Sequence, residues 1–171
     1  MAMRQRKLVL ALCGAAAGSA GLASSAPGDI GFPDGYRRWT HVKSAIGHPP
    51  PGDPPLRFDG IHHIYANEAA IEGYRSGTFA DGAVLVFDRF GIEESKLGIE
   101  PSKRLSIDVM VRDSKRFAAN GGWGFERFDA DGRGIIDEVE RQQCVSCHRR
   151  VEDRAMVFSR FEDPQAAGSA P

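Results

Sequence analysis

The stretch GAVLVFDRF, residues 82–90, is an apolar run with the length of one β-strand. Apolar side chains stand at both odd and even positions, so we expect both faces of this strand to be buried. The later stretch RLSIDVMVRD, residues 104–113, alternates between apolar and polar side chains, which predicts a strand with one wet face. The apolar face of that strand consists of Leu105, Ile107, Val109 and Val111. The two stretches predict neighbouring parts of a β-sheet.

Two further strands are expected before and after this pair. GIHHIYA, residues 60–66, precedes it, and WGFERF, residues 123–128, follows it. The stretch GIEESKLGIEPSK, residues 91–103, is charged and is expected to form a loop. Strands separated by short helices and turns predict an antiparallel sheet.

Helix signals lie at three places. The Pro-Asp pair at 33–34 is expected to open a short helix through GYRRWTHVKS, residues 35–44. Asn67 is expected to cap a second helix that stops at Gly77. A third helix is expected around residues 136–148. With the helices on one side of the sheet, the fold class is α+β.

The two ends of the chain differ in composition from its middle. Residues 1–26 combine basic residues, an apolar run and small residues, which predicts a secretory signal peptide that contains Cys13. The domain is expected over residues 27–163, followed by a loose tail over residues 164–171. The mature chain would then keep two cysteines, Cys144 and Cys147.

The chain of 171 residues has the length of one domain after removal of its ends. The net charge is −1 and the basic residues are scattered, so we expect no nucleic-acid partner. Within the domain, HPPPGDPP at 48–55 is expected to be a stiff, extended linker. MVFSRF at 156–161 is expected to pack back onto the domain.

The stretch CVSCHRR, residues 144–150, places His148 directly behind Cys144 and Cys147. A zinc site would need two more ligands, and the chain has no second Cys-x-x-Cys pair. A thioredoxin-like dithiol would follow a strand near the start of a domain. A structural disulfide stays open, but it leaves His148 without a role. Covalent haem attachment uses all three residues, because the thiols form thioethers and the imidazole binds the iron.

The stretch DADGRGIIDEVE, residues 129–140, has the pattern of a calcium-binding loop. Carboxylates and a glycine fit the required positions, at Asp129, Asp131, Gly134 and Glu140. Arg133, however, places a cation where a ligand oxygen is needed, and the preceding GGWGFERF is strand-like rather than helical. We therefore expect an Asp/Gly turn between a strand and the cysteine-bearing helix, with the calcium loop as the alternative.

Several motifs occur together in the order and spacing of one known family. They are YRRW (36–39), FADG (79–82), VRDSKRF (111–117), GGWGF (121–125), CVSCH (144–148) and MVFSRF (156–161). On these motifs the chain resembles the cytochrome P-460 family over roughly residues 34–161. The resemblance implies a mostly β-sheet domain with one covalent haem c per chain, exported to the periplasm and assembled as a homodimer.

The family has two functional branches. One oxidises hydroxylamine, and its haem carries a further covalent link to a lysine. The other resembles cytochrome c′-beta, lacks that link and binds gases such as nitric oxide in an apolar distal pocket. Phe87 occupies the position that matches the lysine, and the nearest lysines, Lys96 and Lys103, flank a loop. The arginine that the enzymes use on the preceding strand has no match in GIHHIYA.

The resemblance therefore implies an exported c-type cytochrome with a five-coordinate haem that binds small ligands such as nitric oxide. Cys144, Cys147 and His148 would hold the haem, and Phe87 would lie on its distal side with Leu85 on the same strand face. A hydroxylamine oxidoreductase and a simple electron-transfer cytochrome are the alternatives, so enzymatic activity stays open. The redox partner is not identified by the sequence.

Three further pairs are weaker candidates: His62 and His63, Glu138 and Glu140, and Met110 and Met156. The histidines are strand neighbours, so at most one faces the haem as a hydrogen-bond donor or proton shuttle. The glutamates are expected to form a solvated helix start. Either methionine is a conceivable sixth iron ligand, but Met156 is expected to pack in the core, and the resemblance favours an open sixth position.

Overall fold

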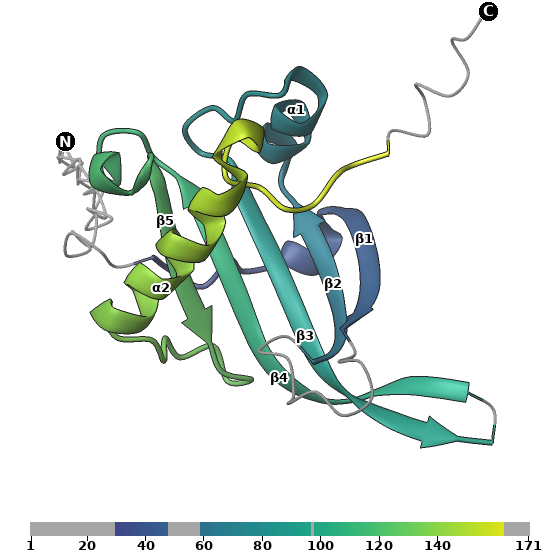
Figure 1. The fold of residues 1–171 in the computed structure, drawn as a ribbon. Helices are drawn as coiled ribbons and strands as arrows, with labels where there is room; N and C mark the ends of the chain where they lie inside the picture. Colours follow the sequence, from purple (N-terminus) through teal and green to yellow (C-terminus); the bar gives the residue numbers. More distant parts are fainter. Residues whose placement is uncertain (1–29, 48–58, 97, 163–171) are drawn as a thin grey trace, which may run out of the picture.

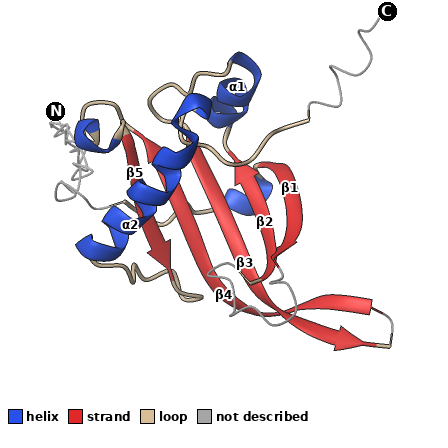
Figure 2. Cartoon of the chain, in the orientation of Figure 1, coloured by secondary structure: helices blue, strands red, loops and turns tan. Residues whose placement is uncertain are grey.

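The computed structural model describes residues 30–47, 59–96 and 98–162. The described residues form an antiparallel sheet with strand order β1-β2-β3-β4-β5, and α1 and α2 lie on one of its faces (Figures 1 and 2). The strands are β1 (Thr40–Gly47), β2 (Gly60–Ala66), β3 (Val84–Ser95), β4 (Gly98–Arg112) and β5 (Trp123–Phe128). The α-helices are α1 (Glu68–Ser76) and α2 (Glu138–His148), and the 3-10 helices are η1 (Tyr36–Arg38), η2 (Ala118–Asn120) and η3 (Arg149–Arg154). The α+β prediction is confirmed.

The first half of β3 is buried or half-buried on both faces, as its sequence predicts. Leu85 belongs to a core cluster with Phe125 and the α2 residue Val145. Val86 belongs to a second cluster on the opposite face, which includes Ile107 and Val109. The α-helices therefore cover one face of the sheet. The N-terminal segment, residues 30–39, covers the other face.

Strand β4 lacks the solvent-exposed face that its alternation of apolar and polar residues predicts. Ser106, on the supposedly solvated side, is 1% exposed, and Met110 packs against the cluster that contains Leu85. The prediction is wrong because this side of β4 lies under the helical layer. Leu105, expected on the apolar face, is 37% exposed.

The expected helix over residues 35–44 is also wrong. The structure has the short η1 and then β1, which pairs antiparallel with β2 from Thr40↔Ala66 to Gly47↔Gly60. Thr40 and Val42 are β-branched residues that favour a strand. Pairing with β2, which is distant in sequence, overrides the local helix signal.

The charged stretch 91–103 is not a loop. Strand β3 continues to Ser95, β4 begins at Gly98, and the ladder still holds at Ser95↔Gly98. The resulting hairpin projects away from the rest of the sheet (Figure 1). Its two faces are largely exposed, so charged side chains are compatible with strand structure here.

Helix α1 follows its predicted end signals, and α2 begins with a capping box. The Asn67 side chain accepts a hydrogen bond from the Ala70 backbone N–H at 3.0 Å, and Gly77 ends α1 with φ 78°. Asp137 and Glu140 form a capping box at the start of α2. None of the helices in the described residues is long and apolar enough to cross a membrane.

The face opposite α2 is closed by the N-terminal segment. The fully buried Asp88 accepts hydrogen bonds from Tyr36 at 2.6 Å, from Arg37 at 3.1 Å and from Arg104 at 2.8 Å. Burial raises the pKa of Asp88, and the hydrogen bond from Tyr36 and the charge of Arg37 oppose that rise. Burial and Asp88 together raise the pKa of Tyr36 to about 12.

Three predicted segments fall wholly outside the described residues: the signal peptide over 1–26, the linker over 48–55 and the tail over 164–171. These segments, and the domain limits at 27 and 163, stay predictions.

Candidate functional site

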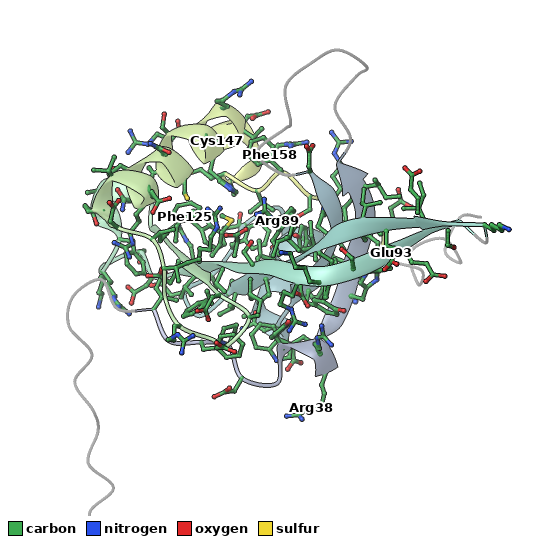
Figure 3. The ribbon with its side chains drawn as sticks, turned by 90° about the horizontal axis from the view of Figure 1, so that it is seen from below. Arg38, Arg89, Glu93, Phe125, Cys147 and Phe158 are labelled. Carbon is green, nitrogen blue, oxygen red and sulfur yellow. The ribbon has the colours of Figure 1, made fainter. Side chains whose placement is uncertain are left out.

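The Cys-x-x-Cys-His motif occupies the last turn of α2. Cys144 and Cys147 are three positions apart, so both lie on one side of the helix. Both residues are half-buried thiols, and Cys144 packs against the core cluster beneath α2. Figure 3 shows Cys147 and Phe158 on the same side of the sheet as Phe125 and Arg89, with Arg38 on the opposite side.

The His148 imidazole is held from several directions. Its Nδ1 lies 2.7 Å from the carbonyl oxygen of Met156, and its ring centroid lies 4.9 Å from that of Phe125 and 5.0 Å from that of Phe158. A carbonyl oxygen only accepts, so Nδ1 donates and the lone pair of the neutral ring is on Nε2. Burial lowers the pKa of His148, while the Met156 hydrogen bond and the charge of Asp108 oppose that effect. The ring is thus fixed in a form that can bind a metal through Nε2.

The turn after η3 supplies the acceptor for His148. Ala155 and Met156 have φ values of 53° and 64°, in the left-handed region that residues with side chains rarely adopt. The Ala155 carbonyl accepts a hydrogen bond from Trp123 Nε1 at 3.0 Å, and the Met156 carbonyl accepts from His148. The side chains of Met156 and Val157 are buried in the core cluster, which confirms that this segment packs back. Met156 therefore acts on His148 through its backbone.

The sheet face below α2 carries three cross-strand rows of side chains. The first row, which packs against α2, is apolar: Ala66, Leu85, Met110 and Phe125. The next row is mixed: Ile64, Phe87, Asp108 and Arg127. The third row is polar: His62, Arg89 and Ser106. This face changes from apolar to charged over the length of a few residues.

Phe87 lies in the middle row, half-buried and on the face that α2 covers. Its ring stacks on His62, with centroids 4.3 Å apart and an interplanar angle of 24°. His63 points to the opposite face, as expected, where its Nδ1 lies 2.7 Å from the hydroxyl of Ser44. Of the two histidines, His62 is the one on the same face as Phe87.

An ion pair in the middle row escaped the sequence analysis. Arg127 donates through Nε to Asp108, and the Ser106 hydroxyl donates to the same carboxylate at 3.2 Å. Both charged side chains are mostly buried. Asp108 stands on the side of β4 that the sequence analysis assigned to solvent, and Arg127 stands on the β5 face that also carries Trp123 and Phe125.

A lysine on β1 was also missed. Lys43 is the register partner of Ile64, which places it on the same sheet face as Phe87. The lysines considered from the sequence lie farther along the chain, with Lys96 at the hairpin tip and Lys103 in β4. Sequence reasoning could not place Lys43 because it took the β1 segment for a helix.

The stretch 129–140 forms a turn that its own arginine closes. Arg133 donates to Asp129 at 3.2 Å and to Asp131 at 2.6 Å. The Asp129 carboxylate also accepts from the backbone N–H groups of Asp131 and Arg133. No group of three or more metal-binding side chains occurs among the residues that the structure describes.

The two glutamates before the motif are occupied at the helix start. Glu140 belongs to the capping box, and Glu138 accepts from Arg141 at 3.0 Å and from Gln142 at 2.8 Å. Arg141 in turn donates to the buried Glu126 at 2.7 Å, which ties α2 to β5. The exposed Glu138 and the half-buried Glu140 form a helix start in contact with solvent, as expected.

The residues present fit a haem. Two thiols lie one turn apart on a helix, an imidazole with one engaged nitrogen follows them, and aromatic rings lie beside and below it. Together with the fold, these features define a haem-binding cytochrome. The chain matches the family model for cytochrome P460 over residues 33–159, and it therefore belongs to the cytochrome P460 family. No curated protein matches the chain.

Proposed function

We propose that the protein is an exported c-type cytochrome with an open sixth position on its iron, where small ligands such as nitric oxide bind. Cys144 and Cys147 would form the two thioether links, and His148 would be the axial ligand. The observation that carries this proposal is the fixed His148 ring, whose Nδ1 is held by Met156 at 2.7 Å while Nε2 stays available. When bound, the haem supplies an iron that takes up diatomic ligands and changes oxidation state.

The protein's contribution on the proximal side is orientation. The Met156 carbonyl fixes both the tautomer and the rotation of His148, and the rings of Phe125 and Phe158 restrict its tilt. The buried Met156 side chain lies close to Gly121, since a Cβ atom there would be 2.7 Å from its Sδ. That position leaves the Met156 thioether engaged in the core.

The protein's contribution on the sheet side is exclusion of water around Phe87. Phe87 and the buried Leu85 stand on the α2-covered face of β3, two residues apart. A phenyl ring there disfavours water and charged ligands, while a small neutral molecule needs no hydrogen-bond donor. We infer that this half of the site selects neutral ligands.

A second candidate function rests on the charged half of the same face. The buried Asp108–Arg127 pair lies beside Phe87 in register, and its carboxylate is close enough to influence the pKa of His148. Such a pair could accept or donate protons during oxidation of hydroxylamine. Phe87, however, stands where the cross-linked enzymes have their lysine, so we rank ligand binding first and electron transfer without an open site third.

The cellular setting is part of the proposal. Residues 1–26 have the composition of a signal peptide, which supports export to the periplasm. The family resemblance supports a homodimer. A redox partner would have to reduce the iron, and we do not identify it.

Optical spectra of the haem-loaded protein test the proposal. We expect a five-coordinate ferrous spectrum that changes on addition of carbon monoxide or nitric oxide. A six-coordinate ferrous spectrum that does not change when either gas is added would favour electron transfer instead. Turnover of hydroxylamine with an electron acceptor would support the oxidoreductase.

A further inference from the structure

The far end of the α2-covered face gathers basic side chains from three neighbouring strands. His62 on β2 pairs in register with Arg89 on β3, and both share a face with Phe87. Lys43 on β1 is the register partner of Ile64, which is two residues from His62 and on the same face. We call Lys43, His62 and Arg89 the basic cluster. Figure 3 shows Arg89 on the same side of the sheet as Cys147 and Phe158.

His62 is held in place inside this cluster. Its ring stacks on Phe87 at 4.3 Å, which fixes its plane against the floor of the site. Its Nδ1 is buried and makes no hydrogen bond within the part of the chain that the structure describes. A buried polar nitrogen without a partner costs free energy, which favours a ligand that supplies one.

The surroundings of His62 are cationic. Burial is the largest cause that lowers the pKa of His62, and the charges of Lys43, His63 and Arg89 lower it further. The Asp108 carboxylate on the same face already accepts from Arg127 and Ser106. Arg89 has five N–H donors in a fixed fork, so it can serve several acceptors at once.

We propose that the basic cluster binds a carboxylate or another small oxyanion at the edge of the site. Lys43 would supply charge, Arg89 a planar pair of donors, and His62 a single N–H. One source of such a group is the pair of haem propionates, and this form of the inference rests on the proposed function. The other source is a free oxyanion from solution. We expect the propionates, because Lys43 lies in the same row as Phe87 and the pair His62–Arg89 forms the next row.

The test compares neutral variants of the cluster with matched controls in the haem-loaded, full-length protein. The variants are Arg89→Gln, His62→Gln and Lys43→Gln. His63→Gln is the control for His62, since it changes the same residue type on the opposite face. Lys96→Gln is the control for Lys43, since Lys96 is exposed at the hairpin tip. The exposed Lys43 can be changed without loss of folding, so the test survives if Arg89→Gln does not fold.

Two measurements separate the sources. If propionates occupy the cluster, the midpoint potential falls in each cluster variant and not in the controls, because an uncompensated anion near the iron favours the ferric state. If free ions occupy it, calorimetry with sodium acetate and inorganic phosphate shows saturable binding to the wild type that the cluster variants lose. Unchanged potentials together with no cluster-dependent anion binding would overturn the inference. Mass spectrometry of each protein reports covalent haem separately, and if none is present the calorimetry alone decides.

Discussion

At the scale of single residues, the site depends on two side chains whose neighbours the sequence does not reveal. His148 is oriented by a backbone carbonyl eight residues later, in a turn with two left-handed residues. Phe87 is stacked on a histidine from the adjacent strand. The motif predicts which residues would hold a haem, and the folded chain shows what fixes His148 and Phe87 in place.

Phe87 is the residue on which ligand access depends. We expect Phe87→Ala to speed binding of carbon monoxide or nitric oxide to the ferrous protein severalfold, because removal of the ring opens the floor of the site. Water should also coordinate the ferric iron more readily. Stopped-flow kinetics and ferric spectra measure both effects.

Phe90→Ala is the matched control for Phe87→Ala. Phe90 lies on the same strand but packs against His63 and Arg104 on the other side of the sheet. Its removal should leave ligand kinetics unchanged. Equal kinetics in both variants and the wild type would make Phe87 an ordinary core residue.

His62 should contribute to the pH dependence of stability. While no anion occupies the basic cluster, burial and the nearby cations lower its pKa in the folded protein, so the unfolded chain binds its proton more readily. The contribution of His62 is complete above the ordinary histidine pKa and is lost as the pH falls below it, through the folded value. We therefore expect His62→Gln to lose less thermal stability than the wild type between about pH 7.5 and pH 5.5. Melting curves across this range check it, and the same behaviour in wild type and variant would contradict the assignment.

At the scale of elements, the end signals of α1 were reliable, whereas the local helix signal over residues 35–44 was overridden by long-range pairing. Asn67 and Gly77 act within one helical turn of themselves, so the sequence predicted both ends of α1. Strand β1 instead forms because β2 is available to pair with it. The β3–β4 hairpin tip follows the same rule, because a ladder already started by apolar residues continues through charged ones. Lys43 was missed because β1 was taken for a helix, and Asp108 was missed because its side of β4 was taken to face solvent.

We expect the connection between β5 and α2 not to bind calcium. Arg133 already pairs with Asp129 and Asp131, and this occupies the carboxylates that a calcium ion would need. A real site filled at 100 times its Kd would add about 2.7 kcal/mol to the free energy of unfolding. We expect melting temperatures that do not change with added calcium or with a chelator. Strong stabilisation of the wild type by calcium, absent in Asp129→Asn, would show a site that the turn conceals.

At the scale of the whole molecule, the sheet is a partition between two different layers. One face is closed by the N-terminal segment, which is held at the buried Asp88 by Tyr36, Arg37 and Arg104. The other face carries α2, the proposed ligand residues and the charged rows of the floor. Helix α2 is attached to β5 by Arg141, which donates to Glu126 and to the carbonyl of Phe125. The hydrogen bonds of Arg141 thus fix the position of α2 over the sheet.

Covalent attachment of haem decides whether the protein is a c-type cytochrome. When the full chain is exported together with a cytochrome c maturation system, we expect its mass to increase by one haem that survives denaturation. Cys144→Ser combined with Cys147→Ser should remove all covalently held haem, because these are the only thiols outside the predicted signal peptide. Intact-mass spectrometry under denaturing conditions measures this directly. The matched control is Ser146→Ala, which lies between the two cysteines and should retain the haem. Haem that stays attached in the double cysteine variant would remove the basis for a c-type cytochrome, whatever ligands the protein binds.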